Sequence, residues 1–267
     1  KMLMGAVPTI PENPVSQSEI KSESLLKVDN VTAGYGLHGQ ITILKNVSLE
    51  MKQGETVGVI GESGSGKTTL GRVISGLMKP REGELLLEGN PLEHYVKDRS
   101  RDDLRQIQFV FQMAETALNP KQRIRHLLGR PLDFYLGMTG KEAEDRIYEL
   151  LDLVELPAEF INRFPRELSG GQLQRINFAR ALAADPKLII CDEITSALDT
   201  LVSKAIIELL LNLKKKLGIA YLFISHDLST VANLADSVAV MRNGEIVEYG
   251  STEKVLKPPY NEYTELL

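Results

Sequence analysis

A glycine-rich stretch at residues 61–69 constrains this chain more than any other, with the sequence GESGSGKTT. It has the spacing G-x-x-x-x-G-K-[ST], in which glycines let successive backbone N–H groups point inward around the phosphates of a nucleotide. The helix that follows adds the partial positive charge of its N-terminus. Residues 57–60, Val-Gly-Val-Ile, read as the buried strand that such a loop must follow, which disfavours a chance match of a glycine-rich turn.

The residues of this loop have expected roles in phosphate binding. Lys67 is placed to reach the β- and γ-phosphates, and the Thr68 hydroxyl to hold Mg²⁺. Residues 68–77 suit the helix that follows the loop. The nucleotide-binding residues predicted in this stretch are Gly61, Glu62, Ser63, Gly64, Ser65, Gly66, Lys67, Thr68 and Thr69. The sequence therefore predicts an α/β core that binds a nucleotide with Mg²⁺.

The composition is that of a globular protein with one large domain or one domain with subdomains, since 43% of its 267 residues are hydrophobic. The formal net charge of −5 gives no basic surface typical of nucleic-acid binders, so no nucleic-acid partner is expected. No apolar run approaches the roughly 18 residues of a transmembrane helix and no signal peptide is visible, which predicts a cytoplasmic location. The single cysteine, Cys191, excludes a disulfide scaffold.

Hydrophobic periodicity divides the rest of the chain into strands and helices. Residues 25–35 and 41–51 alternate apolar and polar side chains, and residues 84–88 precede a Gly-Asn turn, so these segments predict antiparallel strands. Residues 107–111 read as a further core strand. Residues 124–156 are largely helical, with an apolar stripe, and predict an inserted helical subdomain.

Two carboxylates follow a continuous apolar run at residues 188–191, Leu-Ile-Ile-Cys, which reads as a parallel strand covered on both faces. Open α/β sheets bind ligands at the carboxyl ends of their strands. Asp192 is therefore placed to hold Mg²⁺ through its water shell, and Glu193 to polarise an attacking water. An exposed acidic pair at a strand end is the alternative, and the phosphate loop in the same chain disfavours it.

The string LSGGQ at residues 168–172 precedes a segment, 173–183, that suits a helix, and Ser169 reads as its N-cap. Consecutive glycines expose backbone N–H groups at this helix start, which makes a second anion-binding site with nothing in its own neighbourhood to bind. A generic turn and cap is the alternative interpretation.

These motifs resemble those of the nucleotide-binding domains of ATP-binding cassette (ABC) transporters, over about residues 25–267 and in the family's order. They are similar to the Walker A loop at 61–69, the Q-loop glutamine Gln112, the signature motif at 168–172, Walker B with its catalytic glutamate at 188–193, the D-loop at 196–199, the switch histidine His226 and the adenine-stacking aromatic Tyr35. Without the resemblance, the histidine would read as structural and the tyrosine as a packing residue.

The resemblance implies an α/β fold of the P-loop NTPase class: a RecA-like parallel-sheet core, an antiparallel β subdomain and an inserted α-helical subdomain at about residues 113–180. It also implies ATP hydrolysis with Mg²⁺. The implied catalytic residues are Glu193, His226 and Gln112. The implied metal-binding residues are Thr68, Gln112 and Asp192. The implied nucleotide-binding residues outside the loop are Tyr35, Gln112, Asp192, Ser169, Gly170, Gly171, Gln172, Asp199 and His226.

The family's arrangement also implies partners. A signature motif in a different subdomain from Walker A would complete the nucleotide site of a second cassette, in a head-to-tail dimer of like or unlike chains. Membrane permease subunits are the other implied partners, and they would hold the chain on the inner face of the cell membrane. A non-transport ABC ATPase acting on ribosomes or DNA is the alternative. It would have a long coiled-coil insertion or a basic inter-cassette arm, and neither is present.

Local strings resemble one branch of the family, the dipeptide, oligopeptide and nickel importer ATPases. Residues 111–112 with 117–120 are similar to its "FQ…SLNP" string, and residues 259–264 to its "P…HPYT" string. The departures, at residues 113–114, 173 and 194, touch no catalytic position. The expected cargo is a peptide or a related small solute.

The N-terminal residues 1–24 are expected to be a linker or the tail of a preceding domain, with the nucleotide-binding domain at 25–267. Three prolines punctuate a polar stretch there that has no apolar periodicity. Because the chain begins with Lys1 and residues 1–8 look like the continuation of the "PYT" string, we expect a fragment of a fused double cassette. An ordinary disordered N-terminus is the alternative.

Overall fold

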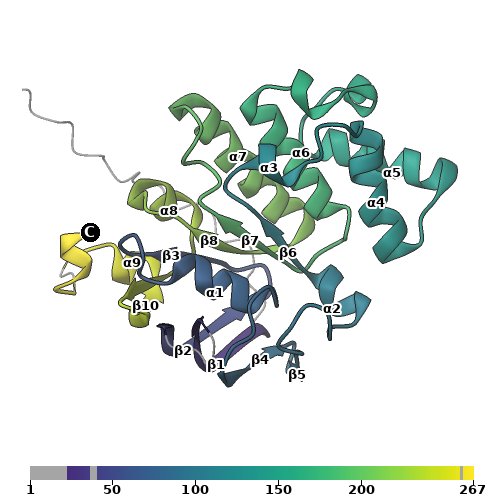
Figure 1. Ribbon diagram of the computed structural model, residues 1–267. Coiled ribbons are helices and arrows are strands. Elements are labelled where there is room, and N and C mark those ends of the chain that lie inside the picture. The colour runs from purple at the N-terminus through teal and green to yellow at the C-terminus, as the bar shows by residue number, and fades with distance from the viewer. Residues whose placement is uncertain (1–22, 37–40, 259–260) are drawn as a thin grey trace, which may run out of the picture.

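The computed structural model describes residues 23–36, 41–258 and 261–267 (Figure 1). Within these residues, one sheet has the strand order β2-β1-β4-β5, with antiparallel neighbours, and the other has the order β10-β9-β3-β8-β7-β6. The second sheet is parallel apart from its edge strand β10. The strands are β1 Ser24–Tyr35, β2 Ile41–Lys52, β3 Thr56–Ile60, β4 Glu82–Leu87, β5 Asn90–Pro91, β6 Ile107–Val110, β7 Leu188–Asp192, β8 Ala220–Ile224, β9 Ser237–Arg242 and β10 Glu245–Ser251.

Helices flank these sheets, and short 3₁₀ turns join some of them. The helices are α1 Lys67–Ile74, α2 Arg101–Gln106, α3 Ala114–Ala117, α4 Ile124–Leu136, α5 Gly140–Leu153, α6 Gly170–Leu182, α7 Thr200–Leu217, α8 Leu228–Leu234 and α9 Thr252–Val255. The 3₁₀ turns are η2 Ala158–Asn162, η3 Pro165–Glu167 and η4 Thr264–Leu266. None of the helices in the described ranges is long and apolar enough to cross a membrane.

The central strands of the parallel sheet are covered on both faces, as their continuous apolar runs predict. Every residue of β3, β7 and β8 is buried. Side chains alternate along β7: Ile189 and Cys191 pack into the cluster that contains the apolar residues of α6 and α7. Leu188 and Ile190 pack into the cluster that contains α1 and the antiparallel sheet. The strand end that carries Asp192 is therefore held from both sides.

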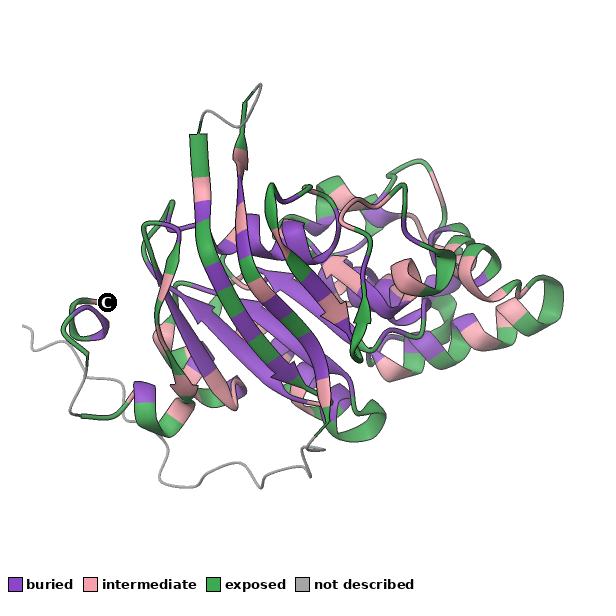
Figure 2. Cartoon of the chain, turned by 90° about the horizontal axis from the view of Figure 1, so that it is seen from below, coloured by how far each residue is buried: buried purple, intermediate pink, exposed green. Residues whose placement is uncertain are grey.

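The antiparallel sheet is half-buried, and Figure 2 shows buried and exposed residues alternating along its long strands. This alternation is the pattern from which strands at 25–35 and 41–51 are predicted. Both strands are confirmed, as is the one predicted at 84–88 before its Gly-Asn turn, with ends shifted by one or two residues. Helix α1 contacts strands of both sheets and so lies between them. This places the start of α1, at the end of the phosphate loop, in the middle of the molecule.

Helices α3 to α6 gather beyond the parallel sheet (Figure 1). The helical pattern expected over 124–156 is two helices, because Gly137 adopts a left-handed conformation with φ 69° and ends α4. The helix expected to run to residue 77 ends at Ile74, before Gly76 at φ 77°. The subdomain boundaries of about 113–180 stay a prediction. The predicted linker lies outside the described residues up to residue 22.

Candidate functional site

The phosphate loop connects the end of β3 to the first residue of α1, Lys67, as predicted. All three of its glycines have backbone conformations that disfavour any side chain, with φ 143° at Gly61, 82° at Gly64 and 108° at Gly66. Gly61 also lies against strand β9, since a Cβ there would sit 2.2 Å from the backbone oxygen of Met241. The loop therefore needs glycine both for its turn and for its close approach to the neighbouring strand.

Lys67 is buried at the centre of this loop, with 6% of its surface exposed. Its Nζ donates hydrogen bonds to the backbone oxygens of Gly61 and Glu62, both at 2.8 Å. Burial lowers the pKa of Lys67, and the nearby carboxylates of Glu193 and Asp192 oppose that shift. Because its hydrogen-bond acceptors are uncharged carbonyls, the ammonium charge is available to an anion bound in the loop.

Asp192, at the end of β7, meets the phosphate loop. The Thr68 hydroxyl donates to its Oδ1 at 3.0 Å, across 124 residues of sequence. Burial raises the pKa of Asp192, while the hydrogen bond from Thr68 and the charges of Arg72 and Lys67 lower it. A hydroxyl and a carboxylate at hydrogen-bond distance are oxygen donors of the kind that Mg²⁺ takes alongside phosphate oxygens.

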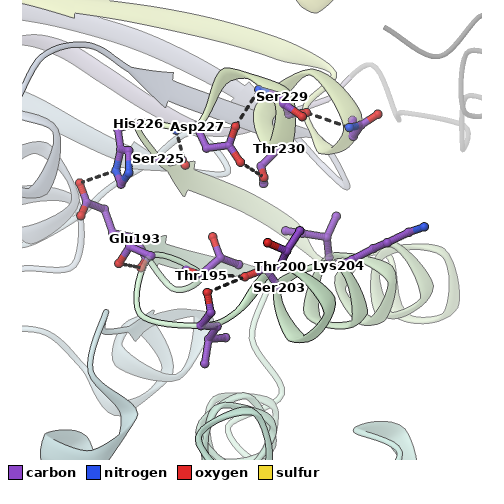
Figure 3. A pocket seen from close by; sticks show the side chains of 14 residues that line it. Glu193, Thr195, Thr200, Ser203, Lys204, Ser225, His226, Asp227, Ser229 and Thr230 are labelled. Carbon is purple, nitrogen blue, oxygen red and sulfur yellow. Dashed lines mark hydrogen bonds and ion pairs between the residues drawn. The ribbon is translucent and has the colours of Figure 1, made fainter. Parts of the chain in front are cut away.

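Glu193 and His226 lie next to each other at the carboxyl ends of β7 and β8, and Figure 3 shows their side chains facing one another. The His226 Nδ1 is 3.6 Å from the Glu193 Oε1. Glu193 has φ 48°, an uncommon conformation for a residue with a side chain, and its N–H donates to the backbone oxygen of Ile224 at 3.0 Å. Non-glycine residues held at positive φ occur disproportionately at functional sites.

Gln112 joins this group through a residue that the sequence analysis does not single out. Its Nε2 donates to the Ser196 hydroxyl at 2.9 Å, and that hydroxyl donates to the backbone oxygen of Glu193, also at 2.9 Å. The sequence indicates a role for Ser196 only through its position as the first residue of the predicted D-loop. The Q-loop glutamine is thus connected to the Glu193 backbone by two hydrogen bonds.

A cavity of about 430 Å³ opens beside Glu193 and His226, between the starts of α7 and α8 (Figure 3). Asp227 caps α8 by accepting the Ser229 N–H at 3.0 Å. Asp199 caps α7 by accepting the Val202 N–H at 3.0 Å. The role of Asp199 in nucleotide binding stays a prediction, since its side chain is the N-cap of α7 in this structure.

The signature motif forms the start of α6, where Ser169 is the N-cap, as predicted. The Gln172 N–H donates to the Ser169 hydroxyl at 3.4 Å, and the Gln172 Oε1 accepts the Ser169 N–H at 3.0 Å. Gly171 lies against α7, because a Cβ there would be 2.5 Å from Val202 Cγ1. Helix α6 packs on the face of the parallel sheet opposite α1. The fold therefore brings the phosphate loop, Asp192, Glu193, Gln112 and His226 together, while the signature motif begins a helix on the opposite face of the sheet from α1.

Tyr35 lies at the end of β1, before the undescribed residues 37–40, and 42% of its surface is exposed. Its hydroxyl accepts a hydrogen bond from Arg72 Nη1 at 3.1 Å, so the ring is tied to the helix that follows the phosphate loop. Nothing in the sequence distinguishes Arg72 from an ordinary exposed helix residue. Elsewhere, no group of three His, Cys, Asp or Glu side chains in the described chain is placed to hold a metal ion.

Comparisons with known proteins agree with this geometry. The family model described as "ABC transporter" matches residues 44–196. A putative peptide import ATP-binding protein of Brucella abortus is 40% identical over 258 residues, covering 94% of this chain and 77% of the relative. The nickel import ATP-binding protein NikE of Brucella suis is 42% identical over 231 residues, covering 84% of this chain and 87% of the relative.

Solved structures show the same fold. One is the dimeric post-hydrolysis state of the ATP-binding cassette MJ0796 bound to ADP and Pi. It is 34% identical, with a TM-score of 0.74 over 85% of this chain and 99% of that chain. The resemblance found in the sequence is thereby confirmed. By its sequence and its fold, the chain belongs to the ABC transporter family, as one of its ATP-binding cassettes.

Proposed function

We propose that this chain binds Mg-ATP at residues 61–69 and hydrolyses it with a water molecule that Glu193 activates. One observation carries the proposal: the 3.0 Å hydrogen bond between Thr68 and Asp192, which joins the phosphate loop to the strand end. Glu193 is the next residue along the chain, and His226 lies 3.6 Å from its carboxylate. Phosphate-binding and proton-accepting groups thus converge at one edge of the parallel sheet.

The residues present fit both the nucleotide and the metal ion. Lys67 and the N-terminus of α1 supply positive charge to a loop whose glycines leave room for phosphates. Thr68 and Asp192 would hold Mg²⁺ through oxygen atoms. When bound, the ion supplies charge neutralisation to the phosphates. Tyr35 would stack on the adenine.

The chemical step needs positioning and charge neutralisation rather than covalent catalysis. Glu193 accepts a proton from the attacking water, and its backbone is fixed by its bonds to Ile224 and Ser196. His226 would contact the γ-phosphate. Gln112 helps to position Glu193 through Ser196, because that serine bonds to both Gln112 and the Glu193 backbone.

The test is the variant Glu193→Gln, which keeps the shape of the side chain and removes its basicity. We expect it to retain Mg-ATP affinity and to lose ATP turnover by at least a hundredfold, which is within the usual contribution of a general base. Glu142→Gln, on helix α5, is the matched control with unchanged turnover. Wild-type turnover in Glu193→Gln would remove Glu193 from the role of base.

We further propose that the chain powers import of peptides or a related small solute, on the cytoplasmic face of the membrane. The names of its relatives, peptide and nickel import ATP-binding proteins, support an importer and give no support to a ribosome- or DNA-directed ATPase. The exposed apolar residues Phe111 and Met113 flank Gln112 and suit contact with a permease. Co-purification with candidate permease subunits, lost on Met113→Asp but not on Leu77→Asp, tests this contact.

A further inference from the structure

The C-terminal residues 261–267 contact the phosphate loop through Tyr263. This tyrosine is 4% exposed and packs in the same apolar cluster as Val240 of strand β9. Its hydroxyl accepts a hydrogen bond from the backbone N–H of Glu62, the second residue of the loop, at 3.5 Å. The string that contains Tyr263 otherwise only indicates a branch of the family, and the proposed ATP hydrolysis gives this tyrosine no role.

The tyrosine ring is fixed from several sides. The Arg242 guanidinium, at the end of β9, lies over the ring at 4.6 Å from its centroid. The Tyr263 N–H donates to the Asn261 Oδ1 at 3.1 Å, and the Thr264 hydroxyl bonds to the Glu248 carboxylate of β10. The ring position is therefore set by the β9–β10 hairpin as well as by its own turn.

The same hairpin holds the far end of the phosphate loop. The N–H of Gly244, in the β9–β10 turn, donates to the backbone oxygen of Ser65 at 3.0 Å. The loop is thus held at Ser65 by the hairpin and at Glu62 by the tyrosine that the hairpin orients.

The contact at Glu62 has a consequence for Lys67, because both involve one peptide plane. The N–H of Glu62 and the C=O of Gly61 belong to the same peptide unit, and in a trans peptide they point in opposite directions. The C=O accepts the Lys67 ammonium at 2.8 Å, while the N–H donates to Tyr263. Lys67 and Tyr263 therefore hold opposite sides of a single plane.

We propose that Tyr263 is a positioning residue for the phosphate loop, which fixes the Gly61–Glu62 peptide plane and, through it, the ammonium of Lys67. The inference rests on the proposed function only in that Lys67 binds the nucleotide's phosphates. Tyr263 itself touches no substrate. Its loss loosens the plane in the free protein and lowers affinity for ligands that Lys67 contacts.

The test compares Tyr263→Phe with Tyr249→Phe. Each variant removes one tyrosine hydroxyl and keeps the ring, but the Tyr249 hydroxyl donates to the backbone oxygen of Glu50, in the antiparallel sheet, at 2.6 Å. In nucleotide-free protein, we expect faster amide hydrogen exchange in the peptide that contains Glu62 for Tyr263→Phe and an unchanged rate for Tyr249→Phe. Mg-ADP and Mg-ATP affinities should fall by about two- to fivefold in Tyr263→Phe alone, since a 3.5 Å hydrogen bond lies at the weak end of the range. The value of kcat at saturating ATP should stay unchanged.

Arg242→Gln is the supporting variant, because it keeps the Tyr263 hydroxyl and removes the cation over its ring. It should raise the exchange rate at Glu62 by less than Tyr263→Phe does. Unchanged exchange and affinity in Tyr263→Phe would overturn the proposal, and so would equal losses of affinity in both tyrosine variants, which would indicate general destabilisation. A wild-type chain that binds no Mg-ATP would instead contradict the proposed function, and the exchange measurement would still decide the role of Tyr263.

Discussion

Replacing Gly61 with alanine should destabilise the chain far more than replacing Gly64, although both glycines stand in the phosphate loop. At Gly61, φ is 143° and a Cβ would lie 2.2 Å from the backbone oxygen of Met241. A strained backbone conformation costs about 1–3 kcal/mol. Displacing a packed backbone carbonyl adds about 1–3 kcal/mol, as other overpacked sites do. The expected loss in the free energy of unfolding is therefore about 2–6 kcal/mol.

Gly64 is the matched control because it isolates the conformational cost. Its φ is 82°, and no atom lies within 4 Å of the position that a Cβ would take. Gly64→Ala should therefore lose only about 1–2 kcal/mol, the cost of a left-handed conformation. Urea unfolding of both variants without nucleotide, followed by circular dichroism, measures the difference. Equal losses in the two variants would refute the conclusion that the loop is built against strand β9.

Three further variants test the adenine contact and the buried charges. Tyr35→Ala should weaken ATP binding by about 5- to 150-fold, the usual range for base stacking. Tripolyphosphate binding, measured by calorimetry, should stay unchanged, and an equal loss for tripolyphosphate would contradict adenine stacking. Lys214→Met should lower the free energy of unfolding by about 2 kcal/mol, because the partly exposed Asp236 carboxylate loses its ammonium partner and, within the described ranges, keeps only the Thr56 N–H. Arg99→Met should change it by less than about 1 kcal/mol, because the guanidinium makes one hydrogen bond, from Nε to the backbone oxygen of Glu93, and its two terminal nitrogens have no partner among the described residues. Urea unfolding measures both variants, and a larger loss at Arg99 would argue against this difference.

The parts of the site that could be predicted from the sequence depend on short motifs attached to apolar strands. Residues 57–60 and 188–191 are continuous apolar runs, and parallel strands that are buried on both faces have this pattern. Because the carboxyl ends of such strands lie at one edge of the sheet, Thr68 and Asp192 are expected to meet despite their separation in sequence. Their hydrogen bond at 3.0 Å agrees with that expectation.

The residues that sequence analysis misses act through side chains that reach across the fold. Ser196 bridges Gln112 and Glu193, Arg72 holds Tyr35, and Tyr263 contacts the loop from 201 residues away. Each is a residue type that is common on helices and turns, and no local periodicity reveals which distant group it meets. The end of α4 is also not predicted by hydrophobic periodicity, since Gly137, in a left-handed conformation, ends the helix within a stretch that is helical on both sides.

The position of the signature motif leads to the last prediction, that ATP turnover per molecule rises with protein concentration. Helix α6 and helix α1 pack on opposite faces of the parallel sheet, and the N-terminus of α6 is exposed. We therefore expect this N-terminus to bind phosphate in the site of another molecule. One solved relative with this fold is a dimer bound to ADP and Pi. Specific activity should increase from nanomolar to tens of micromolar protein, and Glu193→Gln should accumulate as a dimer with Mg-ATP in gel filtration. Gly171→Val, whose Cβ would lie 2.5 Å from Val202 Cγ1 of α7, should displace the start of α6 and remove the increase while ATP binding is retained. Constant activity per molecule across that range, with no dimer by light scattering, would contradict a site shared between two cassettes.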